Sequence, residues 1–128
     1  MYHKSMGLVA IFTAVSVQLA LPPGLLQSLC YVESKHKVDA IHYSDGVGNS
    51  VGICQIKLAA AQQVGFKGTE KDLMDPKNNI YYAGKYLKHQ IERYSAINKG
   101  VIAYNFGHAG DLESTQYQRT VFKIWENK

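Results

Sequence analysis

Several residue types are scarce in this chain of 128 residues, and each shortage excludes a class of protein. With 3 Pro and 11 Gly, the chain is neither collagen-like nor of low complexity. Two cysteines are too few for a disulfide-based scaffold, and their spacing does not suggest a zinc site. The net charge is +4, but the basic residues are scattered singly, so the sequence has no nucleic-acid-binding arm. What remains is a globular composition of one-domain size, whose positive excess favours an anionic partner such as nucleic acid, an acidic membrane surface or an anionic cell-wall polymer.

The first 20 residues differ from the rest. A basic start is followed by an uncharged, mostly apolar stretch over 6–21 and then by Pro22-Pro23-Gly24, an order typical of a secretory signal. The stretch is short for a membrane-spanning helix, which needs roughly 20 apolar residues. We therefore expect residues 1–20 to be a signal peptide or a short membrane anchor, and residues 21–128 to be the working domain. The alternative is a buried core helix.

The remaining pattern predicts a mostly α-helical domain. Apolar residues recur at helical spacing over 25–35, 56–64 and 76–94, then from a cap at Ser95 to Gly107, and again from Thr115. The polar stretch 36–50 predicts a loop or a small irregular hairpin, and 65–74 a connection.

Glu33 occupies an unusual position for an acid. It follows Leu26, Leu29 and Cys30 on one helical stripe, and carboxylates are rarely buried unless they are paired. Burial without a cationic partner raises the pKa of a carboxyl, and a general acid must carry its proton at neutral pH. The alternative is a solvated carboxylate, or one paired with Lys35, Lys37 or Arg93.

Four ordered motifs surround this acid. They are Glu33-Ser34, Gly52-Ile53-Cys54-Gln55-Ile56, Asp75-Pro76 with Asn79-Ile80, and Ala103-Tyr104-Asn105-Phe106-Gly107. This succession resembles the soluble-type, goose-lysozyme-like domain of the lytic transglycosylases, which cleave peptidoglycan. The resemblance covers about 21–110 and implies a lysozyme-like fold with an irregular loop or small hairpin after the catalytic helix.

The resemblance also implies a chemistry. Glu33 is then the single catalytic acid and base, which cleaves the β-1,4 bond between N-acetylmuramic acid and N-acetylglucosamine and leaves a 1,6-anhydro end. No second carboxylate, metal or organic cofactor is implied. The hydrolytic alternative is a lysozyme-type muramidase, for which Asp39 and Asp45 are the nearest acids in the sequence. A non-catalytic peptidoglycan-binding component of a wall-spanning assembly is a further alternative.

Substrate-binding roles follow by position in the motifs. Ser34 is expected to bond the substrate or to orient the cleft, and Gly52 to let the backbone approach the sugar. Gln55 suits amino-sugar groups, Tyr104 is expected to place its hydroxyl against Glu33, and Asn105 to line the cleft.

Cys54 stands where the family commonly has Met. In an exported domain a Cys30–Cys54 disulfide is one expectation, and two buried free thiols are the other. The expected setting is the periplasm or cell envelope, with a secretion or conjugation apparatus as partner, or else a phage particle. Contact with a membrane is expected only through the N-terminal segment.

Overall fold

The computed structural model describes residues 4–44 and 48–127 and confirms a mostly α-helical, lysozyme-like arrangement. Within those ranges the chain forms seven helices and three short strands. Their order is α1 (Lys4–Gln18), α2 (Leu25–Ser34), β1 (Ile41–His42), β2 (Ser50–Val51), β3 (Ile56–Lys57), α3 (Leu58–Gln63), α4 (Glu70–Leu73), α5 (Pro76–Tyr94), α6 (Ile97–Phe106) and α7 (Gln116–Glu126).

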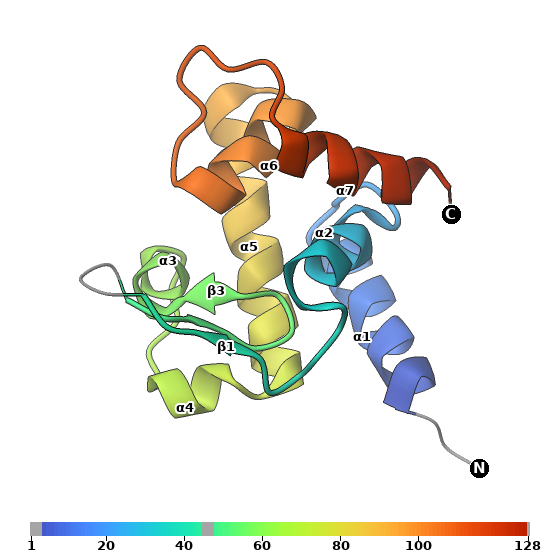
Figure 1. Cartoon of the computed structure of the whole chain (residues 1–128). Coiled ribbons are helices and arrows are strands. Elements are labelled where there is room, and N and C mark those ends of the chain that lie inside the picture. Colours follow the sequence, from blue (N-terminus) through green and yellow to red (C-terminus); the bar gives the residue numbers. More distant parts are fainter. Residues whose placement is uncertain (1–3, 45–47, 128) are drawn as a thin grey trace.

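Helix α5 runs through the middle of the molecule, with α6 and α7 near one end and the strands and α4 near the other (Figure 1). It begins as the sequence predicts, because the Asp75 carboxylate accepts the N–H of Asn78 and Pro76 occupies the first turn. It ends at Ser95, which adopts a left-handed conformation with φ 53°. The predicted capping of α6 by Ser95 is therefore wrong: Ala96 precedes α6, because Ser95 is used to close α5.

The three strands form an antiparallel sheet in the order β1-β2-β3, so the stretch after α2 is a small hairpin. The helix predicted from Ile56 begins two residues later, because Ile56 and Lys57 pair with β2 as strand β3. Pairing with a neighbouring strand here overrides the local helix pattern. The predicted connection over 65–74 also contains α4, which starts at a capping box between Thr69 and Asp72.

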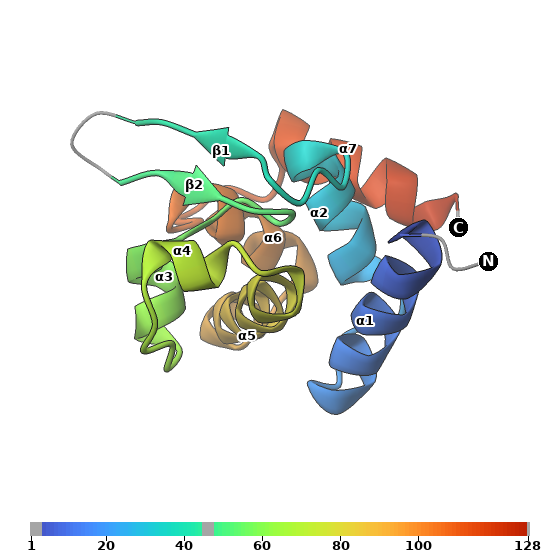
Figure 2. The same cartoon turned by 90° about the horizontal axis from the view of Figure 1, so that it is seen from below.

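Helix α1 packs against α5 and α2 on the far side of α2 from the hairpin (Figure 2). Phe12 is 1% exposed and belongs to the main hydrophobic core. Gly84 of α5 permits the close approach, since a Cβ there would lie 3.0 Å from side-chain carbons of Val15 and Leu19. This packing has the form that the core-helix alternative describes for the N-terminal segment. In the ranges that the structure describes, no helix is both long and apolar enough to cross a membrane.

Candidate active site

A pocket of about 490 Å³ opens between the end of α2, the sheet and the end of α6. Four of the predicted site residues line it, from three different parts of the chain: Glu33, Gln55, Tyr104 and Asn105. Two predicted residues, Ser34 and Gly52, lie outside its lining. The lining also includes three motif residues without a predicted role, namely Ile56, Phe106 and Gly107. Residues outside the four motifs complete it, namely His42, Ser44, Ser50, Lys57, Ala60 and Tyr86. Among all these lining residues Glu33 is the only acid.

Glu33 lies in the last turn of α2, which ends where Lys35 adopts a left-handed conformation. Its side chain is half-buried, and burial raises the pKa of its carboxyl from 4.5 to about 7. A hydrogen bond from Tyr117 and the charge of Lys57 both act in the opposite direction, and burial outweighs them. Within the described residues, no ion pair joins Glu33 to Lys35, Lys37 or Arg93.

The hydroxyl that contacts Glu33 belongs to Tyr117 of α7. Its Oη donates to Glu33 Oε2 at 2.5 Å, which leaves Oε1 to carry the exchangeable proton. The prediction that Tyr104 makes this contact is wrong, because Tyr104 Oη donates to the backbone oxygen of Cys54 at 2.7 Å. Burial raises the pKa of both phenols well above 10, so both remain hydrogen-bond donors.

Tyr117 was missed because its sequence position shows only that it lies on the apolar face of a last helix. Helix α7 packs on α2, 84 residues away in the chain, and no local pattern specifies that pairing. The capping residue Thr115, which accepts the N–H of Gln118, does fix Tyr117 in the first turn of α7.

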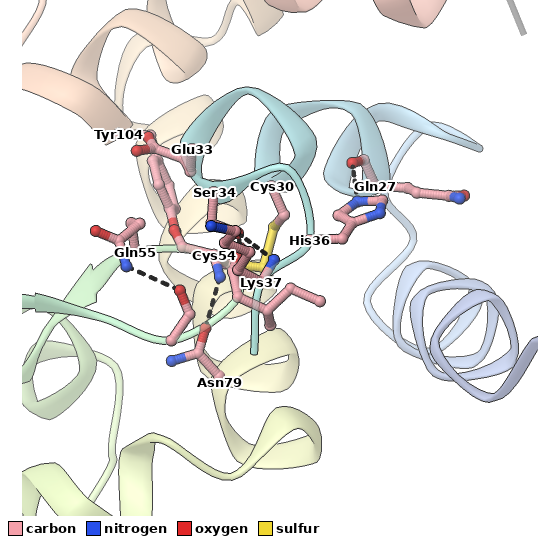
Figure 3. Close-up of a disulfide and its surroundings, with 12 residues drawn as sticks. Gln27, Cys30, Glu33, Ser34, His36, Lys37, Cys54, Gln55, Asn79 and Tyr104 are labelled. Carbon is pink, nitrogen blue, oxygen red and sulfur yellow. Dashed lines mark hydrogen bonds between the residues drawn. A yellow bond between two sulfur atoms is a disulfide. The ribbon is translucent and has the colours of Figure 1, made fainter. Parts of the chain in front are cut away.

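A disulfide joins Cys30 of α2 to Cys54, so the bonded alternative holds (Figure 3). It connects α2, which carries Glu33, to the turn that carries Gln55. Ser34 ties the same two segments together, since its hydroxyl donates to the carbonyl of Ile53 at 2.6 Å and accepts the N–H of Lys37. Of the two roles predicted for Ser34, the structure therefore shows the orientation of the cleft.

Gln55 presents its side chain at the pocket from a left-handed backbone conformation, with φ 51°. Its amide nitrogen donates to the carbonyls of Gly52 and Ala40, at 2.9 and 3.0 Å. Those two bonds fix the orientation of the amide, so the group that Gln55 offers to a ligand is its amide oxygen as an acceptor.

Gly52 approaches Asn79 rather than the open pocket. A Cβ at Gly52 would lie 2.1 Å from Asn79 Nδ2, and the backbone has φ 81°. The structure thus shows close packing of Gly52 on Asn79, and its contact with a sugar stays a prediction. Asn79 is fully buried, donates to Val51 and Leu73 carbonyls and accepts the N–H of Cys54. This side chain holds the turn between β2 and β3 in place.

The far wall of the pocket comes from the end of α6. Asn105 and Phe106 are exposed there, with Phe106 56% accessible, before α6 ends at Gly107 in a left-handed conformation. An exposed aromatic ring beside a polar amide is a surface on which a sugar ring can stack. Among the described residues, no cluster of three or more His, Cys, Asp or Glu side chains could hold a metal ion.

Comparison with known proteins identifies the family. The transglycosylase SLT domain matches residues 11–126. The chain belongs to this family. It is 30% identical over 94 residues to a protein named transglycosylase from Enterobacteria phage PRD1. The aligned region covers 73% of this chain and 32% of the phage protein. It is 25% identical over 111 residues to a protein named X polypeptide from Escherichia coli, with 82% of this chain and 66% of that protein covered. This SLT chain thus spans less than two thirds of the length of either relative.

Proposed function

We propose that the protein is a peptidoglycan lytic transglycosylase that cleaves the β-1,4 bond between N-acetylmuramic acid and N-acetylglucosamine with Glu33 as its acid and base. The observation that carries this proposal is the half-buried Glu33 carboxyl, with a pKa that desolvation raises to about 7, at the wall of an open polar pocket. Membership of the SLT family supports the same activity.

The reaction needs only groups that the pocket and the sugar supply. Protonated Glu33 donates its proton to the glycosidic oxygen as the bond to the anomeric carbon breaks through an oxocarbenium-like state. The 6-hydroxyl of the same N-acetylmuramic acid then attacks that carbon, and its proton passes to the Glu33 carboxylate. The carboxyl is thereby restored, the product carries a 1,6-anhydro ring, and no water is consumed.

The composition of the pocket favours this route over hydrolysis. An inverting or retaining hydrolase needs a second carboxylate close to the acid. Asp39 is exposed and lines a different cavity, next to α1, while Asp45 lies outside the described residues. Among the described residues that line the pocket, Glu33 is the only acid, which suits a reaction whose nucleophile is the sugar itself.

The setting we propose is the cell wall, reached by export to the periplasm or on a phage particle. Membership of the SLT family supports action at the cell wall, and the similarity to a phage transglycosylase supports an association with phage. A secretion or conjugation apparatus is the protein partner expected for an exported form. The proposed reaction calls for no cofactor.

The test is product analysis on purified sacculi with wild type, Glu33→Gln and the matched surface variant Glu92→Gln. We expect wild type and Glu92→Gln to release anhydro-muropeptides, and Glu33→Gln to lose cleavage by about 100-fold or more while still binding sacculi. Products with reducing ends, heavier by one water, would establish the hydrolytic alternative. A wild-type protein that binds without cleaving would establish the binding component.

A further inference from the structure

The three strands place one polar row of side chains across the sheet. His42 lies opposite Ser50, and Ser50 lies opposite Lys57. Residues that lie directly opposite each other in antiparallel strands point to the same face. The other row, Ile41, Val51 and Ile56, is apolar, and its Val51 and Ile56 are buried. We call His42, Ser50 and Lys57 the cross-strand row.

All three residues of the cross-strand row line the same pocket as Glu33. Lys57 is half-buried, and its charge acts on the Glu33 carboxyl, which places the ammonium group within electrostatic reach of the cleft. Lys99 and Glu113 form the one ion pair among the described residues, so within residues 4–44 and 48–127 no carboxylate lies in salt-bridge contact with Lys57. A cation in a concave site without such a partner is available to an anionic ligand.

The donors of the row suit a carboxylate. Lys57 supplies a positive charge and up to three N–H donors, Ser50 a hydroxyl, and His42 an N–H in either tautomer. The sugar rings, hydroxyls and N-acetyl groups of the glycan backbone are uncharged. The anionic groups of peptidoglycan are the carboxylates carried on the muramic acid residue, at the lactyl group or on its stem peptide.

We propose that the cross-strand row binds a carboxylate of the muramic acid substituent and so distinguishes peptidoglycan from an uncharged amino-sugar polymer. This inference rests on the proposed function. The inference makes Lys57 a specificity-determining residue beside Glu33. It also explains why a cation lies in a cleft that binds a glycan whose sugar rings are neutral.

The experiment measures binding in the Glu33→Gln background, where no cleavage occurs and where an effect of Lys57 on the proton of Glu33 cannot interfere. Co-sedimentation is measured for Glu33→Gln alone and combined with Lys57→Met, Lys57→Arg or the exposed control Lys77→Met. Three polymers serve as probes: intact sacculi, sacculi stripped of stem peptides so that the lactyl carboxylate is free, and sacculi whose carboxyls are converted to neutral amides.

We expect Lys57→Met to weaken binding to a carboxylate-bearing polymer by roughly threefold to tenfold, the range for a partly exposed charged hydrogen bond, and to leave binding to the amidated polymer unchanged. Lys57→Arg should restore most of the loss. An effect confined to intact sacculi identifies the stem peptide as the source of the carboxylate, and one on stripped sacculi identifies the lactyl group.

Equal losses on the amidated polymer, or no difference between Lys57→Met and Lys77→Met, would overturn the inference. Circular dichroism checks folding, and Lys57→Gln replaces Lys57→Met if the apolar side chain unfolds β3. The products of cleavage test the proposed function separately. If the wild type forms anhydro products but the binding test fails, only the carboxylate-binding role of the cross-strand row is rejected.

Discussion

Glu33 keeps its proton because burial outweighs two neighbours that favour its charged form. Desolvation raises its pKa to about 7, whereas the Tyr117 hydroxyl and the Lys57 charge lower it. A general acid works best when its pKa lies near the operating pH, and these opposed effects bring the carboxyl there. In the proposed reaction, proton donation requires the neutral form of Glu33, so we expect the rate of cleavage to decline as pH rises through about 7.

Substitution of Tyr117 tests this balance. Tyr117→Phe removes a hydrogen bond that lowers the pKa of Glu33, so the pKa rises and the declining limb of the pH–rate profile moves to higher pH. The rate should also fall, by roughly tenfold for the loss of one charge-assisted hydrogen bond. The measurement is the initial rate of sacculus cleavage between about pH 5 and pH 9, a span chosen to bracket the limb.

Tyr104→Phe is the matched control, since it deletes the same atom from a tyrosine that bonds the Cys54 carbonyl instead of the acid. Its declining limb should stay closer to that of wild type. A larger displacement of the limb in Tyr104→Phe than in Tyr117→Phe would contradict the assignment of Tyr117.

At the scale of elements, the site depends on how α2 is fixed to the turn between β2 and β3. The disulfide, the Ser34 hydroxyl and the buried Asn79 amide all bond that turn. Catalytic groups must be held in a precise geometry. A covalent bond and side-chain hydrogen bonds, one of them from a buried amide, together restrain this short turn. The position of Gln55 relative to Glu33 is therefore set by elements that are themselves tied together.

Removing the disulfide should cost stability. It closes a loop with a sequence separation of 24 residues, for which the loss of unfolded-state entropy predicts about 3 kcal/mol. We expect the double variant Cys30→Ala/Cys54→Ala to show this decrease in the free energy of unfolding by urea. Wild type treated with reductant should approach the variant, and the variant should not respond to reductant. Equal stability of oxidised and reduced wild type would show that the bridge does not contribute.

The helices that the sequence predicts well are those with signals of their own. Asp75 and Pro76 mark the start of α5, Thr115 that of α7, and Gly107 the end of α6. Strand β3 could not be predicted, because its pairing with β2 is a contact between segments. The same reason explains the exchange of Tyr104 for Tyr117 beside the acid: both lie on apolar helical faces, and only helix packing decides which one reaches Glu33.

At the scale of the whole molecule, the role of α1 decides whether the active protein includes the first 20 residues. Its Phe12 and Val15 belong to the main core, Lys88 donates to the carbonyl of Leu19, and the SLT match begins at residue 11. We propose that this helix stabilises the folded domain. If the first 20 residues were removed, the face of α5 around Gly84 would lose the side chains that cover it.

Two substitutions in α1 separate these roles. Phe12→Ala deletes a side chain that is 1% exposed, and a buried Phe→Ala change costs about 3–5 kcal/mol. Val17→Ala shortens a side chain of the same helix that is 77% exposed, and we expect it to change the free energy of unfolding by no more than about 0.5 kcal/mol. Urea unfolding of the full chain measures both. Small and equal effects of the two substitutions would mean that the fold does not need α1, as expected for a segment that is removed on export. The difference that we expect implies that a chain starting at Leu21 would be substantially less stable than the full chain.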